Sequence, residues 1–152
     1  MCTGNVCRSP MAEALLIQRL AQRGLEARVI SRGLGAPVGR APHEFALATA
    51  AAHGVEISPD KRAAAVTSPE LAAATVVFVM DHGHRHKVQQ RFPAASGKTF
   101  LLGQGTVGEI ADPIQLPLAA FETAWAGIDA GVDHWLDQLQ QAGMLHVVRQ
   151  PV

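Results

Sequence analysis

The feature that most constrains the fold is the start of the chain, where five residues separate a cysteine from an arginine, Cys2 and Arg8. Ser9 is a favourable N-cap and Pro10 suits the first position of a helix, so the sequence predicts a helix that begins here and ends at Gly24. The cysteine and the arginine therefore belong to a short loop that leads directly into a helix N-terminus.

A loop in this position is suited to holding an anion. Its backbone N–H groups, the positive end of the helix macrodipole and the Arg8 guanidinium all favour negative charge. Thiols in such surroundings ionise readily, so Cys2 is expected to be a thiolate at neutral pH. Gly4 and Asn5 tolerate left-handed backbone conformations, which turn successive amides inward. The loop is predicted to surround a tetrahedral oxyanion, with the thiolate below it and the guanidinium at its side.

Strand and helix patterns alternate along the rest of the chain, without repeats or a low-complexity linker. Val76–Met80 is an unbroken apolar run, as expected of a parallel strand buried on both faces, and Asp81 after it is a suitable N-cap. The other elements predicted are strands at 27–31 and 99–102 and helices at 42–54, 82–91 and 118–141. This alternation predicts a single α/β domain over residues 1–152, with 142–152 as a C-terminal tail.

Length, charge and composition fit such a domain. The chain has 152 residues, of which 48% are hydrophobic and 17% charged, and this is ordinary for a globular fold with a real core. Thirteen basic residues balance thirteen acidic ones, so neither nucleic acid nor an acidic membrane surface is an expected partner. The sequence shows no signal-peptide pattern and no apolar run of membrane length. A cytoplasmic location without membrane insertion is therefore expected.

The segment C-T-G-N-V-C-R-S-P at residues 2–10 resembles the signature loop of the low-molecular-weight protein tyrosine phosphatases. Three more segments share the resemblance. Residues 31–35 resemble the family's Ser-Ala-Gly segment, and residues 76–81 resemble its apolar strand ending in Met-Asp. Residues 111–113 resemble its general-acid loop. Residues 31–40 are most similar to bacterial members that act with tyrosine autokinases in exopolysaccharide export. The resemblance extends from Cys2 to about Leu139.

The resemblance implies a doubly wound, Rossmann-like fold with a parallel four-stranded sheet flanked by helices. It also implies hydrolysis of phosphotyrosine through a phosphocysteine, with Cys2 as nucleophile, Arg8 binding the phosphate and Asp112 as general acid and base. No metal or cofactor is expected. The expected partner is a tyrosine-phosphorylated protein, such as a bacterial tyrosine autokinase. Taken alone, Asp112 before Pro113 is also a common turn.

The residues expected to bind the substrate come mostly from the loop, with one apolar residue beyond the general acid. They are Thr3, Gly4, Asn5, Val6, Cys7, Ser9 and Ile114. By the resemblance, Ser9 hydrogen-bonds the departing thiolate; the alternative is a plain N-cap. Asn5 and Ser31 would tie the loop down, with Asp81 as a further supporting residue, although an Asn here is also a common turn residue. Cys7 would either form a reversible disulfide with Cys2 under oxidation or be a small buried apolar residue.

Several positions depart from the family pattern. Ile114 occupies a position where the family usually has an aromatic residue. His84, three residues after Asp81, occupies a position where Asn is common, and Lys61 one where a His is expected. The chain has no tyrosine. The histidines at 82, 84 and 86 could suggest a metal site, but no further ligand pattern accompanies them. A solvated helix near the rim of the cleft is the favoured interpretation.

The family has a strand directly before its cysteine, whereas this chain offers only Met1. Either the sequence begins late, at an internal methionine, or the tail Met144–Val152 takes the vacant place in the sheet. The first explanation is favoured, because Arg149 and Pro151 fit poorly in a central strand. Solvent exposure of Val147 and Val148 would argue against the second.

Two other functions share this loop. An arsenate reductase would need at least one cysteine beyond Cys2 and Cys7, which are the only two in the chain. A phosphate-binding module that has lost catalysis is the stronger alternative. Hydrolysis of para-nitrophenyl phosphate distinguishes the enzyme from the binding module.

Overall fold

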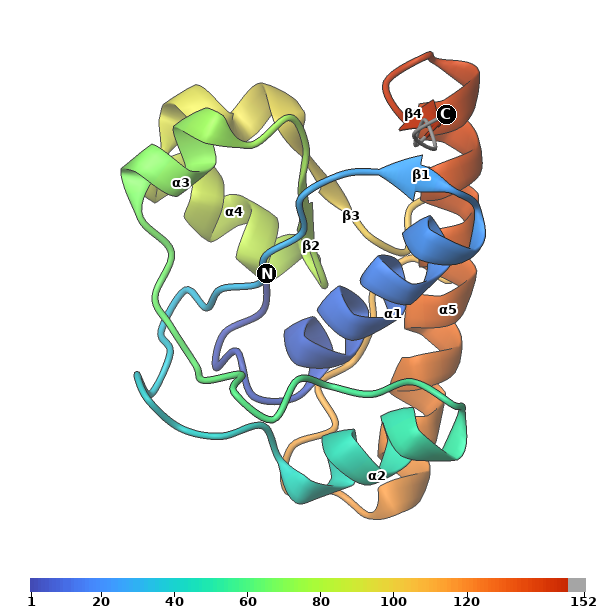
Figure 1. Ribbon diagram of the computed structural model, residues 1–152. Helices are drawn as coiled ribbons and strands as arrows, with labels where there is room; N and C mark the ends of the chain where they lie inside the picture. The colour runs from blue at the N-terminus through green and yellow to red at the C-terminus, as the bar shows by residue number, and fades with distance from the viewer. Residues whose placement is uncertain (148–152) are drawn as a thin grey trace.

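The computed structural model describes residues 1–147 of the 152. Its helices are α1 (Arg8–Gln22), α2 (Glu44–Ala52), α3 (Ser68–Ala73), α4 (His82–Arg91) and α5 (Leu118–Gln141), with a 3-10 helix η1 (Pro93–Lys98). Its strands are β1 (Leu25–Glu26), β2 (Val77–Val79), β3 (Thr99–Leu101) and β4 (His146–Val147). In Figure 1, β2 and β3 lie in the middle of the molecule, between α3 and α4 on one side and α1 and α5 on the other.

The strands form two separate pairs in the described part of the chain. β2 and β3 are parallel, whereas β1 and β4 are antiparallel. Isolated parallel bridges also link Cys2 to Gly33 and Gly33 to Ala65. The α/β class and the parallel pairing are therefore confirmed. Within residues 1–147, the strands thus form two pairs and isolated bridges, whereas the sequence predicted one continuous four-stranded sheet.

The strand predicted at 27–31 is wrong. β1 ends at Glu26, and residues 27–31 carry no strand pairing within residues 1–147. The reason is that β4, the strand that pairs with β1, is only two residues long. In that pair Val147 lies opposite Leu25 and is 72% exposed. The described part of the tail is thus an edge strand, not a buried central one; Val148 lies outside the described residues.

Two hydrophobic clusters hold the elements together. The first fills the space between α1, α2 and α5, where Met11 and Leu15 of α1 and Phe121 and Ile128 of α5 are fully buried. The second lies where β2 and β3 pack against α4, and it includes Val79, Val88 and Leu101. Burying these apolar faces against each other fixes the position of α1 and of the β2–β3 pair. No helix within residues 1–147 combines the length and the hydropathy that a bilayer crossing requires.

The first helix begins slightly earlier than the sequence predicts. α1 starts at Arg8 with Cys7 at its N-cap, so Ser9 and Pro10 lie inside the first turn and the prediction of Ser9 as N-cap is wrong. The reason is that the Ser9 hydroxyl is turned toward the loop, where Cys2 lies. The amino group of Met1 donates to the carbonyl of Phe78, which places the start of the loop against β2.

Candidate active site

The signature loop, residues 2–8, lies at the N-terminus of α1 and carries the cysteine inward. The Sγ atom of Cys2 accepts a hydrogen bond from the backbone N–H of Asn5 at 3.2 Å and lies 3.0 Å from the hydroxyl of Ser9. Asn5 has a φ of 55°, in the left-handed region that few residue types tolerate. This turn brings the amide of Asn5 onto the sulfur. Two polar groups that favour a thiolate therefore contact Cys2.

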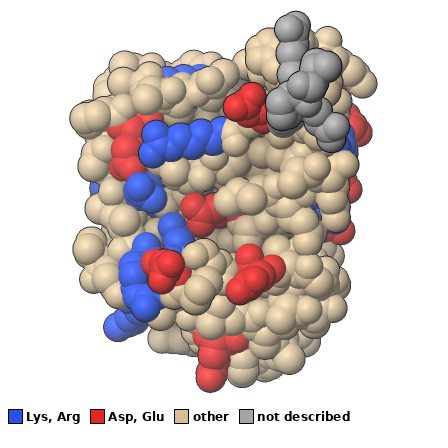
Figure 2. Space-filling model, viewed as in Figure 1, with Lys and Arg blue, Asp and Glu red and all other residues tan. Residues whose placement is uncertain are grey.

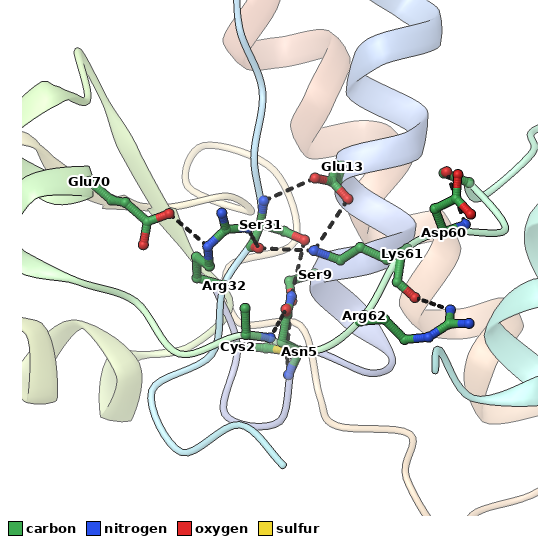
Figure 3. Close-up of polar contacts among 12 residues, drawn as sticks. Cys2, Asn5, Ser9, Glu13, Ser31, Arg32, Asp60, Lys61, Arg62 and Glu70 are labelled. Carbon is green, nitrogen blue, oxygen red and sulfur yellow. Dashed lines mark hydrogen bonds and ion pairs between the residues drawn. The ribbon is translucent and has the colours of Figure 1, made fainter. Parts of the chain in front are cut away.

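The side chain of Asn5 holds this unusual backbone conformation in place. Its Nδ2 donates to the hydroxyls of Ser9, at 2.8 Å, and Ser31, at 3.0 Å, and its Oδ1 accepts from the N–H of Ala64 at 3.1 Å. Figure 3 shows Asn5 between Cys2 and Ser9, with Ser31 above them. The structure thus brings together the pair Asn5 and Ser31 that the sequence analysis singled out. It also makes Ser9 part of a chain of hydrogen bonds that ends on the sulfur of Cys2.

A partly buried ion pair fixes Ser31 from behind. The Ser31 N–H donates to Glu13 at 3.1 Å, and the Ser31 carbonyl accepts from Lys61 Nζ at 3.0 Å; Glu13 and Lys61 are 3.6 Å apart (Figure 3). Burial lowers the pKa of Lys61, although Glu13 opposes the shift. The sequence analysis noted Lys61 only as a departure from the family pattern and did not predict its contact with Glu13.

Arg8 joins the loop to two carboxylates. Its NH1 group donates to the carbonyl of Ile110 at 2.8 Å and to Asp81 Oδ2 at 3.3 Å, and its NH2 group lies 3.6 Å from Asp112 Oδ2. Arg8 is buried, whereas the side chain of Asp112 is 46% exposed. The end of β2 and the loop after β3 therefore meet at the guanidinium, as expected where the carboxyl ends of parallel strands lie at one edge of a sheet.

Asp112 makes the turn considered from the sequence and also lies beside the arginine of the signature loop. Its Oδ1 accepts from the backbone N–H of Ile114 at 3.1 Å, which makes the turn, while its other oxygen faces Arg8. Ile114 itself is 40% exposed beside this carboxylate. A carboxyl group fixed at one oxygen and open to solvent at the other can transfer a proton to a bound substrate.

Asp81 caps α4 and also supports Arg8. Its Oδ1 accepts from the N–H of His84 at 2.8 Å, while Oδ2 accepts from Arg8. Burial disfavours the charged carboxylate, but the His84 N–H and the Arg8 guanidinium outweigh it and lower the pKa of Asp81 below its ordinary value. Asp81 is therefore a carboxylate at neutral pH and a fixed anionic partner of Arg8.

Not every loop side chain faces the anion site. Val6 and Cys7 are buried in the first hydrophobic cluster, to which Cys2 also belongs, but unlike Cys2 they have no side-chain hydrogen bond within residues 1–147. Burial raises the pKa of the Cys7 thiol to about 12, with Asp112 and Cys2 adding to the shift. Both cysteines are free thiols in the structure. Thr3 is the exposed residue of the loop, and Gly4 is partly exposed.

His84 is the residue that the sequence analysis misjudged. The prediction of a solvated helix is correct for His82 and His86, which are exposed, but wrong for His84, which is 3% exposed. Its Nε2 lies 3.0 Å from the hydroxyl of Thr3, because α4 begins directly beside the signature loop. Within residues 1–147, no group of three or more His, Cys, Asp or Glu side chains is arranged to hold a metal ion.

Comparison with known proteins identifies close relatives. A family model described as low molecular weight phosphotyrosine protein phosphatase matches residues 1–145. A probable low molecular weight protein-tyrosine-phosphatase EpsP of Ralstonia nicotianae is 40% identical over 143 residues, which cover 94% of this chain and 95% of EpsP. A protein-arginine-phosphatase of Geobacillus stearothermophilus is 35% identical, over 92% of this chain and 93% of its own length.

A solved structure agrees with the sequence matches. The tyrosine phosphatase Wzb from Escherichia coli K30, crystallised in complex with sulphate, superimposes with a TM-score of 0.84 at 31% identity. The superposition covers 91% of this chain and 94% of Wzb. The fold and the sequence thus lead to the same group of proteins.

Proposed function

This chain belongs to the low molecular weight phosphotyrosine protein phosphatase family, and we propose that it hydrolyses phosphotyrosine in proteins through a phosphocysteine on Cys2. The observation that carries the proposal is the arrangement around the loop. Cys2 Sγ lies against the Asn5 N–H and the Ser9 hydroxyl, while Arg8 links the loop to Asp112. A nucleophile, an anion ligand and a proton donor are thereby supplied by one loop and one neighbouring turn.

In the first step, the Cys2 thiolate attacks phosphorus in line with the leaving oxygen. The S–P bond forms while the bond between phosphorus and the tyrosine oxygen breaks, and Asp112 gives its proton to that oxygen. The Arg8 guanidinium stays anchored through NH1 to Asp81 and the Ile110 carbonyl, and it can exchange its 3.6 Å contact with Asp112 for the phosphoryl oxygens. In the second step, Asp112 accepts a proton from water as the water oxygen attacks phosphorus. The S–P bond then breaks and releases inorganic phosphate.

The choice of Cys2 over Cys7 follows from their surroundings. Burial raises the pKa of the Cys7 thiol to about 12, so this thiol stays protonated at neutral pH. Cys2, which is equally buried, instead contacts hydrogen-bond donors at the start of a helix, where a thiolate is stabilised. These surroundings support Cys2 over Cys7 as the nucleophile.

Turnover of para-nitrophenyl phosphate and of a phosphotyrosine peptide tests the proposal. Cys2→Ser should abolish both activities. Asp112→Asn should lower kcat by about 10²- to 10⁴-fold for the peptide, whose leaving group needs a proton, and by less for para-nitrophenyl phosphate. Asp60→Asn, an exposed aspartate, is the matched control and should keep full activity. Phosphate binding by the wild type without turnover would instead favour the binding-module function.

Phosphoarginine is the second substrate to compare, because one relative is named a protein-arginine-phosphatase. The exposed side chain of Ile114 beside Asp112 supports phosphotyrosine, since it offers an apolar surface to a phenyl ring but nothing to a charged guanidinium. We expect kcat/KM to be higher for a phosphotyrosine peptide than for a phosphoarginine peptide of the same sequence. The reverse order would assign this chain to the arginine phosphatases.

The proposed partner is a tyrosine-phosphorylated protein of the cytoplasm, and specifically a bacterial tyrosine autokinase. Resemblance to the exopolysaccharide type of phosphatase supports this choice. Incubation of the phosphorylated autokinase with the wild-type protein should remove its phosphotyrosine, whereas Cys2→Ser should bind it without releasing phosphate. A phosphorylated autokinase that is neither bound nor dephosphorylated would exclude this partner.

A further inference from the structure

His84 makes two contacts that the mechanism above does not use. Its Nδ1 accepts a hydrogen bond from the backbone N–H of Met80 at 3.3 Å, and its Nε2 lies 3.0 Å from the hydroxyl oxygen of Thr3. A neutral imidazole that accepts at Nδ1 carries its proton on Nε2. His84 is therefore a hydrogen-bond donor to Thr3, across 81 residues of sequence.

The surroundings of His84 keep its imidazole neutral. The ring is buried, and burial lowers its pKa to about 4 although Asp81 acts in the opposite direction; Arg8, the Met1 amino group and Lys87 add to the lowering. At neutral pH the imidazole is thus uncharged. The Met80 N–H favours the tautomer with its proton on Nε2, while Asp81 Oδ1, 3.5 Å from Nδ1, is the competing partner.

Thr3 is the exposed residue of the signature loop and directly follows Cys2. Its carbonyl accepts from the N–H of Gly35 at 3.0 Å, and its methyl group faces Gly35. Backbone and methyl group are thereby held, and the hydroxyl oxygen accepts from His84. A hydroxyl that accepts one hydrogen bond still has its own proton to donate. Because Thr3 is exposed, that proton can reach a group bound at the loop.

We propose that His84 is a positioning residue, which orients the Thr3 hydroxyl so that its O–H donates to the outer oxygen of a phosphoryl group held in the signature loop. The inference rests on the proposed function and extends it to a residue of α4. In a phosphate ester the outer oxygen carries the leaving group. In inorganic phosphate a free oxygen takes the same place, so phosphate affinity reports on the same contact.

A double-mutant cycle tests whether His84 acts through Thr3. Thr3→Val and His84→Leu should each lower kcat/KM for para-nitrophenyl phosphate, and the affinity for inorganic phosphate, by about three- to tenfold. The double variant should lose no more than the larger single loss, because both changes remove one contact. His84→Gln keeps an N–H near the Nε2 position and should restore most of the activity. His86→Leu, exposed on the same helix, is the matched control and should lose nothing.

Additive losses in the double variant would overturn the proposal, since His84 would then act on the fold and not through Thr3. If His84→Leu does not fold, long-range proton–nitrogen NMR of the wild type decides: a proton on Nε2 supports the proposal, and a proton on Nδ1 contradicts it. A wild type without turnover would refute the proposed function alone. Phosphate affinity and the ring tautomer would still test His84 in that case.

Discussion

At the scale of single residues, both cysteines of the signature loop are buried, and they differ in the polar groups that contact the sulfur atom. The side chain of Cys7 packs into the core and its pKa is raised to about 12, whereas Cys2 contacts two hydrogen-bond donors. We predict that iodoacetamide at pH 7 alkylates Cys2 and leaves Cys7 unmodified, and that inorganic phosphate slows the reaction by occupying the loop. Tandem mass spectrometry of the peptide that spans residues 1–8 locates the label. A label on Cys7 alone would contradict this account.

The buried imidazole of His84 predicts how stability depends on pH. Its pKa is lowered to about 4 in the folded protein, against 6.5 when unfolded, so the unfolded chain binds more protons between these values. The contribution of His84 is complete above pH 6.5 and is lost as the pH falls toward 4, by up to about 3 kcal/mol. Urea unfolding should give a flatter pH dependence for His84→Gln than for the wild type. Equal slopes in this range would show that another group causes the dependence.

Lys61 should affect both stability and activity, because it completes the ion pair that holds Ser31. Lys61→Met leaves Glu13 partly buried without its cationic partner, at a cost of about 2 kcal/mol in unfolding free energy. Asn5 then loses a fixed partner, and kcat/KM should fall about tenfold. Lys61→His should recover much of the unfolding free energy and much of kcat/KM. Arg62→Met, an exposed neighbour whose guanidinium donates to the carbonyls of Pro59 and Lys61, is the control, and an equal loss there would argue against a specific role for Lys61.

The proximity of the proposed catalytic residues could be predicted from the sequence, and so could the pair Asn5 and Ser31, but other supporting contacts could not. Cys2 and Arg8 are fixed by local spacing, and Asp112 follows a strand whose end must lie near theirs in a parallel sheet. The contacts from His84 to Thr3 and from Lys61 to Glu13 join residues far apart in the chain. They depend on how helices pack against the loop, and no periodicity or spacing encodes that packing.

At the scale of elements, patterns with strong local signals were predicted within a few residues. The ranges predicted for α1, α2, α4, α5, β2 and β3 all overlap the observed elements, although the cap predicted for α1 was wrong. α3 was missed, although Thr67 and Glu70 form a capping box that could have identified it. The strand at 27–31 was wrong because strands depend on partners elsewhere in the chain, which local sequence does not supply.

α1 carries the signature loop at its N-terminus and is joined to α5 by ion pairs near its C-terminal end. Arg19 contacts Asp129 at 2.7 Å and Asp133 at 2.6 Å, and Arg23 contacts Asp137 at 2.6 Å. These groups are partly exposed, so we predict that Arg19→Ala lowers the unfolding free energy by about 1 kcal/mol, and by less in concentrated salt. kcat/KM should stay unchanged, because Met11 and Leu15 still hold α1 in the core. A loss of activity without a loss of stability would contradict this separation.

At the scale of the whole molecule, the site lies where the two hydrophobic clusters meet. Cys2 belongs to the first cluster, while the end of β2, which belongs to the second, supplies Asp81 to Arg8. Figure 2 shows acidic and basic side chains interspersed over one face, in keeping with thirteen of each in the chain. Recognition of a phosphoprotein is therefore expected to depend on the loop and its rim more than on long-range electrostatic attraction.

The central claim is that phosphate passes through a covalent bond to Cys2. Acid quenching of the protein during turnover of para-nitrophenyl phosphate, followed by intact-mass and fragment mass spectrometry, tests this most directly. We predict one phosphoryl group per chain, located on Cys2, absent from Cys2→Ala and retained in Cys7→Ser. A phosphoryl group on any other residue, or undiminished turnover by Cys2→Ala, would contradict the account.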